Sequence, residues 1–491
     1  MKNNKFLSVC LCAAVFASCI TACGETGTSP VETSAGTDTT PVTEEVTVDI
    51  YKTDLPDDLD FGGKTFRIYG FDMGSFDAVM DVQELNGDVY DEAIYKRNRA
   101  VEDRLNIVFS ETYNGDMTSD GKRAVSKQVM SADDFTDLTQ INDRDAWSLA
   151  QENYVIPIND FKYIDLSKPY WTKSINDNMT IHNDLYFAVG DYNTVAYQMI
   201  NVLLVNQRLM SAYDLGDIYD IVDSGKWTLD LMNEMMLAVA ADTNGDSTYD
   251  DQDMYGITAH NKHMLPNFWI SGGLLTVDKN EQDEPRFIMA TSDEFASFYM
   301  KFLNLMHSNN VYYDAEKITP DYADNHVFFN GQSLFTIVRC TWMDRYRDME
   351  DQFGIIPCPK LTEAQDKYYS RLESLSLCFT PVTASDTDFV GAVLEEWSSQ
   401  SAKIVVPTYY DIVLKSKYTR DEESVKMLDM LFENRIYDWG DTIWSGQIRD
   451  GVLAGKFKTN NTDLASTIAS LNPKVEKLIA ELIATFDTEG Y

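Results

Sequence analysis

Short strand-like runs alternate with helical patterns along most of the chain. The run 65–69 alternates in polarity after Gly62-Gly63 and predicts a strand, and residues 107–109 predict the next one. Between these runs, the apolar residues of 88–105 fall on one stripe among charged residues, which is typical of a helix that packs on a sheet. Alternation of this kind predicts the α/β class.

The same pattern continues toward the C-terminus. A helix is predicted near 121–131 and another at 227–241, where Thr228 can cap the first turn and Trp227 and Met232 can form a hydrophobic staple. From about residue 386 the pattern is mostly helical. Further strands are predicted at 137–141, 185–189, 202–205, 334–338, 353–356 and 375–379.

Composition narrows the class of protein. The 491 residues are 44% hydrophobic, which allows a large core and two or three domains. Lys and Arg number 40 against 79 Asp and Glu, so the net charge is −39. Because phosphate contacts need clustered Lys and Arg, this balance argues against nucleic acid as a partner. It also argues against attachment to an anionic membrane surface by charge alone.

The N-terminus has the pattern of an export signal. Lys2 and Lys5 precede a short apolar stretch at 6–20, and Ile20-Thr21-Ala22-Cys23 resembles a bacterial lipobox. We predict a lipoprotein signal peptide at 1–22 and lipidation of Cys23, which would anchor the protein to the outer face of the cytoplasmic membrane. The alternative is an ordinary secretory signal that contains a cysteine. Residues 23–57 are acidic and rich in Ser and Thr, which predicts a disordered tether.

After cleavage at Cys23, the folded part keeps Cys340, Cys358 and Cys378. An odd number leaves at least one thiol unpaired, and their pairing stays open. All three stand among apolar residues, so we expect small core residues and not a metal or redox site.

Known catalytic motifs do not emerge. The run Gly62-Gly63-Lys64-Thr65 lacks the upstream glycine of a phosphate loop and precedes a strand instead of following one. His260 and His263 lack an evident third metal ligand and are more typical of surface or loop positions. We therefore expect a protein that is not an enzyme.

Residues 242–253 have the oxygen spacing of a calcium-binding loop. Side-chain oxygens fall at loop positions 1, 3, 5, 9 and 12, and position 7 offers its backbone carbonyl. Ser247 replaces the usual glycine at position 6, and the acid at position 12 is the shorter Asp, as in dockerin-type loops. The alternative is an acidic turn whose carboxylates are solvated. The predicted Ca²⁺ ligands are Asp242, Asn244, Asp246, Thr248, Asp250 and Asp253.

Several blocks, in their order, resemble the extracellular solute-binding protein family 1, the substrate-capturing lipoproteins of ABC importers. They are Asp60-Phe61-Gly62-Gly63-Lys64-Thr65-Phe66, Leu85-Asn86-Gly87-Asp88, Tyr95-Lys96-Arg97-Asn98-Arg99, Leu185-Tyr186-Phe187-Ala188-Val189-Gly190-Asp191, Gly225-Lys226-Trp227-Thr228, Tyr255-Gly256, Phe353-Gly354-Ile355-Ile356-Pro357-Cys358-Pro359-Lys360 and Tyr418-Thr419-Arg420-Asp421-Glu422-Glu423-Ser424.

The resemblance implies a two-lobed periplasmic-binding-protein-like fold of class II, in which each lobe is a mixed sheet flanked by helices and the ligand lies in the cleft between them. Lobe 1 would comprise 58–190 and 370–402, and lobe 2 would comprise 191–369 and 403–491. The hinge strands would then cross near Gly190-Asp191, Tyr368-Tyr369 and Lys403.

The family binds small polar ligands, many of them sugars, and delivers them to a membrane permease. A sugar needs an aromatic plate beneath its ring and polar groups at its hydroxyls. We select candidates that follow predicted strands, where α/β proteins bind ligands, or that match the family's ligand positions. The predicted ligand-binding residues are Phe71, Asp72, Asp143, Trp147, Asp191, Tyr192, Arg339, Trp342, Trp439 and Trp444.

Other readings remain open. The same fold could carry a peptide or a charged metabolite, although the acidic balance disfavours an anionic ligand. A calcium-stiffened adhesin or structural lipoprotein is a second possibility, and a glycoside hydrolase is a third. For the first reading we expect a monomer whose partners are a sugar-like ligand, an ABC-transporter permease and the membrane that holds its lipid anchor.

Overall fold

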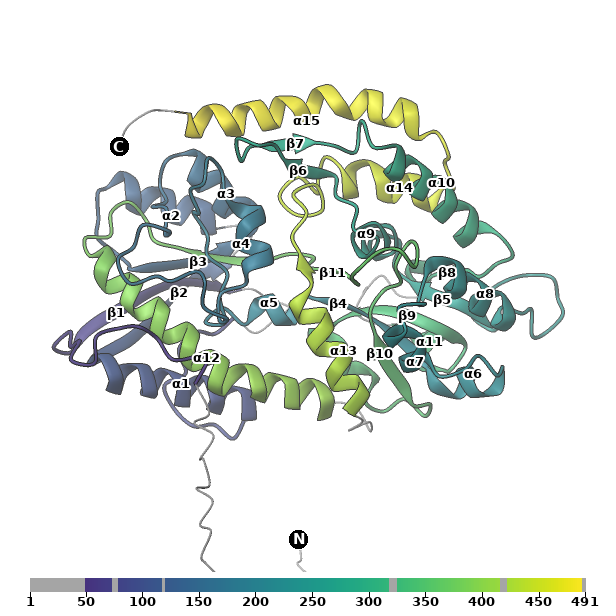
Figure 1. The fold of residues 1–491 in the computed structure, drawn as a ribbon, viewed down its shortest axis with the longest axis horizontal. Coiled ribbons are helices and arrows are strands. Elements are labelled where there is room, and N and C mark those ends of the chain that lie inside the picture. Colours follow the sequence, from purple (N-terminus) through teal and green to yellow (C-terminus); the bar gives the residue numbers. More distant parts are fainter. Residues whose placement is uncertain (1–48, 73–77, 117–119, 318–324, 416–421, 488–491) are drawn as a thin grey trace, which may run out of the picture. The chain divides into compact units, whose positions relative to one another are not determined.

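A computed structural model describes residues 49–72, 78–116, 120–317, 325–415 and 422–487. The predicted signal peptide, Cys23 and residues 24–48 of the predicted tether lie outside these residues. In Figure 1 the described elements form two groups, each built around its own sheet.

The first sheet has the strand order β12-β3-β1-β2. Strand β1 (Lys64–Asp72) runs parallel to both β2 (Ile107–Asp116) and β3 (Leu138–Asn142), and β12 (Ser376–Phe379) is antiparallel to β3. Helices α1 (Val89–Leu105), α2 (Gly121–Met130), α3 (Asp143–Gln151) and α12 (Thr387–Lys415) accompany this sheet. The sheet is therefore mixed and flanked by helices, as the resemblance implied.

The second sheet has the order β10-β4-β9-β5-β8 and is also mixed. Its strands are β4 (Asn201–Asn206), β5 (Tyr255–Ala259), β8 (Tyr312–Asp314), β9 (Ser333–Arg339) and β10 (Phe353–Ile356). Every residue of β4 and β9 is buried. Their apolar runs are typical of central strands that are covered on both faces.

The remaining elements surround these sheets. Two short strand pairs join β6 (Val277–Lys279) to β7 (Pro285–Phe287) and β11 (Ser370–Arg371) to β13 (Arg435–Ile436). The helices are α4 (Lys173–Met179), α5 (Val195–Gln198), α6 (Gln207–Ala212), α7 (Ile218–Asp223), α8 (Leu229–Val239), α9 (Asn261–Ser271), α10 (Asp293–His307), α11 (His326–Phe329), α13 (Glu422–Glu433), α14 (Ala454–Lys458) and α15 (Leu464–Phe486), with 3₁₀ turns η1 (Ala315–Lys317) and η2 (Cys340–Tyr346) and the π-helical turn η3 (Arg449–Leu453).

Local signals explain the start of α8. The hydroxyl of Thr228 accepts a hydrogen bond from the Leu231 N–H, and Asp230 lies in the first turn, where the helix dipole favours a carboxylate. Trp227 and Met232 are both fully buried, as the predicted staple requires. The predicted cap and helix are confirmed.

The end of the predicted tether is ordered. Leu55 is buried, and the Thr53 hydroxyl donates to Glu396 of α12 over 3.0 Å. Asp49 forms an ion pair with Lys403 over 2.8 Å. The prediction of a disordered tether was therefore wrong for residues 49–57, because these side chains gain partners on α12 that a local reading of the sequence does not show.

The predicted strand at 185–189 does not form. The Leu185 N–H donates to the side chain of Asn159, and the Val189 N–H donates to the side chain of Asn176. These side chains satisfy backbone groups that a strand would offer to a neighbouring strand. The prediction was wrong because an apolar run forms a strand only where a neighbouring strand can accept its backbone hydrogen bonds.

The chain passes from the first sheet to the second and back again. Strands β1, β2 and β3 belong to the first sheet, β4, β5, β8, β9 and β10 belong to the second, and β12 returns to the first. Lys403 was expected in a hinge strand, but it lies inside the continuous helix α12, which contacts α1 as well as η2 and α13. The exact lobe boundaries stay a prediction.

The three cysteines of the folded part test the prediction that they are core residues. Cys340, Cys358 and Cys378 are free and buried, and burial raises the pKa of the Cys340 and Cys358 thiols to about 12. The prediction of core cysteines is confirmed. In the described part of the chain, each helix is too short or too polar to span a bilayer.

Candidate functional site

Arg339 and Glu373 are the centre of a buried ionic group. Arg339 ends β9, and its Nε donates to Glu373 Oε2 over 2.9 Å while Nη2 bonds to Oε1. His263 Nδ1 lies 3.1 Å and Arg371 Nη1 3.5 Å from Glu373 Oε2. Burial alone would raise the pKa of Glu373, but these positive and polar neighbours hold it well below its usual value. Glu373 is therefore a buried carboxylate.

The group continues through Asp441 to Arg449. Arg371 Nε lies 2.6 Å from Asp441 Oδ2, and Arg449 Nη1 lies 2.9 Å from Asp441 Oδ1. Arg449 also forms a bidentate pair with Asp450 at 2.8 and 2.9 Å. The chain of charges thus connects β9, β11 and η3. Forked pairs of this kind fix side chains in one geometry as well as adding energy.

His263 was expected on the surface or in a loop, but it is buried in α9 beside Glu373 and Arg371. Burial lowers the pKa of His263 to about 4. The imidazole is therefore neutral near pH 7. The prediction was therefore wrong for His263, whereas His260 lies in the loop that precedes α9, although it is buried there.

Trp342 adjoins the ionic group. It lies in η2, just after β9, and is 6% exposed. The guanidinium carbon of Arg339 lies 4.2 Å from the centroid of its ring. One face of Trp342 is therefore covered by a cation, in a contact that is favourable when the cation is desolvated.

Three other predicted tryptophans meet in one cluster. The ring centroids of Trp147 and Trp439 are 4.6 Å apart, and the ring centroids of Trp439 and Trp444 are 5.5 Å apart. Trp439 Nε1 donates to the carbonyl of Asn178, and Phe187 packs against Trp147 at 4.9 Å. Trp439 and Trp444 lie in turns between β13 and η3 instead of the expected helix. The cluster joins α3, beside the first sheet, to a segment more than two hundred residues later.

Asp143 lies in the same helix as Trp147 of the tryptophan cluster. It begins α3 and is 2% exposed, with the Arg144 and Leu375 N–H groups donating to its carboxylate at 2.9 and 3.3 Å. Burial raises the pKa of Asp143 to about 6, and the charges of Arg144 and Arg449 oppose that shift. Arg449 acts electrostatically on Glu373 as well. Arg449 therefore connects the ionic group with Asp143.

The other predicted ligand residues are placed elsewhere. Phe71 is fully buried in the first sheet, where its ring meets Tyr69 at 5.3 Å. Asp72 ends β1, and its side chain lies outside the described part of the structure. Phe71 therefore packs within the first sheet, and a ligand-binding role for Asp72 stays a prediction.

Asp191 and Tyr192 also have structural partners. The Tyr197 hydroxyl donates to Asp191 over 2.5 Å, and burial raises the pKa of this carboxyl to about 7. The Tyr192 hydroxyl donates to the Ala188 carbonyl, and its ring stacks on Trp397 at 5.7 Å. These contacts give both residues a role in the core.

Sequence reasoning missed part of the ionic group. Arg371 and Glu373 alternate with Ser370 and Leu372 in a segment that is buried throughout. Two opposite charges within such a short run near a predicted hinge were a usable signal. Asp441 and Arg449 gave no comparable signal, because neither belongs to a recognisable motif. Their role depends on contacts that only folding creates.

The predicted calcium loop is an ordered turn. The carboxylate of Asp242 accepts the Gly245 N–H at 2.6 Å and the Ser247 N–H at 2.9 Å, and Ser247 takes the left-handed conformation with φ 66°. Asp253 is fully buried and accepts the Thr243 N–H at 2.9 Å. No set of three carboxylates of the described loop brings its oxygens within 4.8 Å of one another. A cation would have to draw them inward.

Comparison with known proteins identifies the fold. No protein-family model and no curated protein matches the chain. Among solved structures, the sugar-binding protein MalE from Xanthomonas citri is 13% identical, with a TM-score of 0.59 over 87% of this chain and 100% of that one. UspC from M. tuberculosis is 13% identical, with a TM-score of 0.57 over 86% and 100%.

A third structure is the ABC substrate-binding protein Lmo0181 from Listeria monocytogenes in complex with cycloalternan. It is 13% identical, with a TM-score of 0.51 over 85% of this chain and 99% of that one. The chain therefore has the two-lobed α/β fold of these binding proteins, as the order of its sequence blocks implied.

Proposed function

We propose that this protein is a member of extracellular solute-binding protein family 1. In this proposal it captures a mono- or oligosaccharide by lobe closure and delivers it to an ABC-transporter permease. The fold and the sugar-binding proteins that share it support this proposal. The observation that carries it is the cluster of Trp147, Trp439 and Trp444 beside Asp143 and the ionic group. Aromatic faces next to charged hydrogen-bonding groups match a sugar's C–H faces and hydroxyls.

The burial of these groups bears on how a ligand would enter. The three tryptophans and Asp143 are each less than 10% exposed, so a ligand reaches them only if the elements around them separate. Lobe opening and closing about a hinge provides such a movement. A ligand that contacts both lobes would then favour the closed arrangement. Solution scattering should show compaction when a tight ligand binds.

The experiment is a thermal-shift screen of mono- and oligosaccharides, because a ligand that binds the folded state raises Tm by mass action. The variant Trp444→Phe should weaken the response to the best sugar. Trp227→Phe, a buried tryptophan at the start of α8, is the matched control and should leave the response unchanged. A panel without any shift, equal losses in both variants, or turnover of a chromogenic sugar would contradict the proposal.

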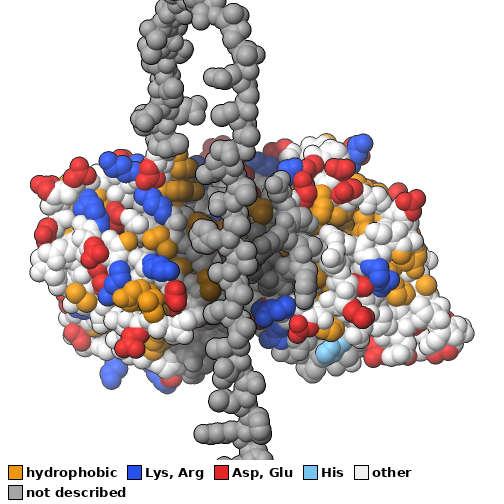
Figure 2. Space-filling model, turned by 90° about the horizontal axis from the view of Figure 1, so that it is seen from below, with side chains coloured by type: hydrophobic (Ala, Val, Ile, Leu, Met, Phe, Trp, Pro, Cys, Tyr) orange, Lys and Arg blue, Asp and Glu red, His pale blue; other side chains and the backbone are white. Residues whose placement is uncertain are grey.

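Two accompanying proposals concern location and metal. Lipidation of Cys23 would hold the protein on the outer face of the cytoplasmic membrane, which suits delivery to a permease. The 242–253 loop would bind a structural Ca²⁺, supported by its oxygen spacing and by the left-handed residue at Ser247. On the face in Figure 2, Asp and Glu are interspersed with Lys and Arg among the described residues, which gives no support to a nucleic-acid partner.

A further inference from the structure

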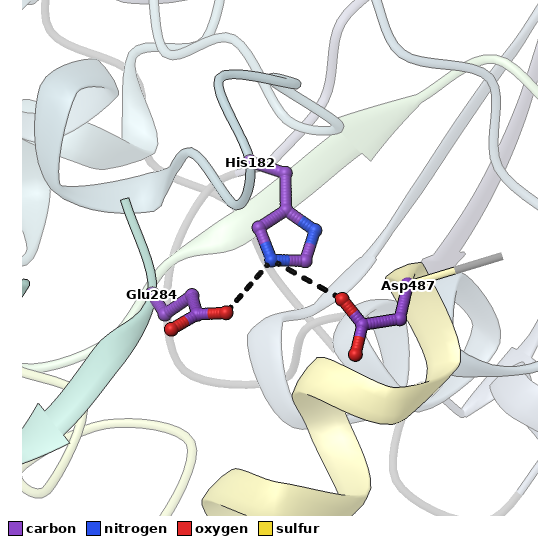
Figure 3. Close-up of side chains that lie close together, drawn as sticks. All are labelled: His182, Glu284 and Asp487. Carbon is purple, nitrogen blue, oxygen red and sulfur yellow. Dashed lines mark hydrogen bonds and ion pairs between the residues drawn. The ribbon is translucent and has the colours of Figure 1, made fainter. Parts of the chain in front are cut away.

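His182, Glu284 and Asp487 bring three metal-ligating side chains together from distant parts of the chain. His182 lies in the turn 181–184, Glu284 precedes β7, and Asp487 follows the last turn of α15 (Figure 3). One ligand atom from each lies within 4.8 Å of the other two. Within the described ranges this is the only such set of His, Cys, Asp or Glu side chains.

His182 makes one hydrogen bond and one longer contact within the cluster. His182 Nε2 lies 3.1 Å from Glu284 Oε1 and 3.6 Å from Asp487 Oδ1. A contact of 3.6 Å is too long for a hydrogen bond, and one ring nitrogen carries at most one proton. Zinc bonds of about 2.0–2.2 Å place tetrahedral ligand atoms about 3.3–3.6 Å apart. The two distances from His182 are therefore close to those between ligand atoms that share one metal ion, and the two carboxylate oxygens lie within 4.8 Å of each other.

Hydrogen bonds aim two of the three ligands. Asn280 Nδ2 donates to Glu284 Oε2 over 2.7 Å, which leaves Oε1 directed at His182. The His182 N–H donates to the Asp283 carbonyl, and the Asn183 N–H donates to the Asp283 carboxylate at 2.9 Å. The turn that carries His182 is thus pinned to the turn that carries Glu284. Supporting bonds of this kind orient metal ligands and tune their affinity.

The cluster is also accessible. The His182 and Glu284 side chains are 26% and 24% exposed, and that of Asp487 is 62% exposed. A surface hollow of about 580 Å³ is lined by residues that follow His182 or precede Asp487 in the chain, among them Asp184, Tyr186, Thr485 and Phe486. An ion has a route from solvent, and a water can complete a tetrahedral shell.

We propose that His182, Glu284 and Asp487 form a binding site for a divalent transition-metal ion of the zinc class, completed by water. The ion fastens the end of α15 and the β6–β7 hairpin to the turn 181–184. This turn precedes the crossing at Gly190-Asp191, whereas the other two ligands follow it, so the metal joins segments assigned to different lobes. The site differs from the calcium loop, because an imidazole nitrogen suits zinc and calcium prefers oxygen.

The test is calorimetric titration of the purified protein with Zn²⁺. The buffer contains excess Ca²⁺, which occupies any site made of oxygen ligands only. We expect binding of a Zn²⁺ ion and a rise in Tm. His182→Ala and Glu284→Gln should each weaken Zn²⁺ binding by about tenfold or more, since loss of even a supporting group costs that much. Co²⁺ in place of Zn²⁺ should show the visible absorption of a tetrahedral site in the wild type and lose it in His182→Ala.

Glu281→Gln is the matched control, because Glu281 is exposed in the same turn as Glu284. It should bind Zn²⁺ as the wild type does. Absence of Zn²⁺ binding, or equal affinity in the wild type and Glu284→Gln, would overturn the proposal. The proposal would also be overturned if His182→Ala and Glu284→Gln lowered Tm by the same amount with and without a chelator. The cluster would then be an ion pair of a protonated histidine. None of these results depends on the sugar ligand.

Discussion

Arg339 and Glu373 form a two-point ion pair that is almost completely shielded from water, with side chains 7% and 4% exposed. The pair joins the end of β9 to the segment that follows β11. A buried carboxylate is stable only if its charge is compensated, and here two arginines and a histidine surround it.

Glu373→Gln should lower the free energy of unfolding by about 3–5 kcal/mol, because it removes the buried carboxylate that pairs with the Arg339 and Arg371 guanidinium groups. Urea denaturation at neutral pH measures the change. Asp278→Asn is the control, since its partner Arg286 is 58% exposed, and it should cost less than about 1 kcal/mol. Equal effects of the two substitutions would show that the buried pair has no special role.

Asp191 makes stability depend on pH. Burial raises its folded-state pKa from 3.8 to about 7, against the opposing effects of Tyr197 and Arg435. A raised pKa means that the folded state holds the proton more tightly than the unfolded state. Its contribution is fully present below about pH 4 and is lost as the pH rises through about 7.

Asp191→Asn should therefore flatten the fall in stability between about pH 4 and pH 7. The measurement is urea denaturation across that range. Asp58→Asn replaces an exposed carboxylate and should keep the wild-type slope. If the Asp191 variant keeps that slope as well, the carboxyl is ionised in the folded protein throughout the range.

Calcium should stabilise the 242–253 loop. We expect heat of binding and a rise in Tm with millimolar Ca²⁺, because extracellular modules of this type have Kd values of about 0.1–1 mM. Asp246→Asn should weaken binding, whereas Asp251→Asn, an exposed residue at loop position 10, should not. If Ca²⁺ does not bind, or if both substitutions weaken Ca²⁺ binding equally, the loop is a solvated acidic turn and not a calcium site.

Lipidation is predicted at a single cysteine. Labelling of expressing bacteria with radioactive palmitate should mark the wild type and should be lost in Cys23→Ala, because no other residue can accept the lipid at that cleavage site. Cys19→Ala keeps the Ile20-Thr21-Ala22-Cys23 run and should retain the label. Unchanged labelling of the Cys23 variant would refute the anchor.

Local signals were enough for much of the secondary structure. The Thr228 cap, the helix predicted at 88–105 and the strand predicted at 334–338 each appear in the structure. Caps and periodicity depend on residues a few positions apart, so they survive whatever the tertiary contacts are. The run 185–189 has a similar apolar character but no neighbouring strand.

The sequence by itself determined the α/β alternation and, through its ordered blocks, the two-lobed fold. The tertiary structure alone decided which candidate residues meet. Trp147 packs against Trp439, Arg339 pairs with Glu373, and Asp191 accepts a hydrogen bond from Tyr197. A buried charge or polar group needs a partner, and that partner can come from any part of the chain. The contact of His182 with Glu284 and Asp487 also arises only on folding, and no spacing in the sequence predicts it.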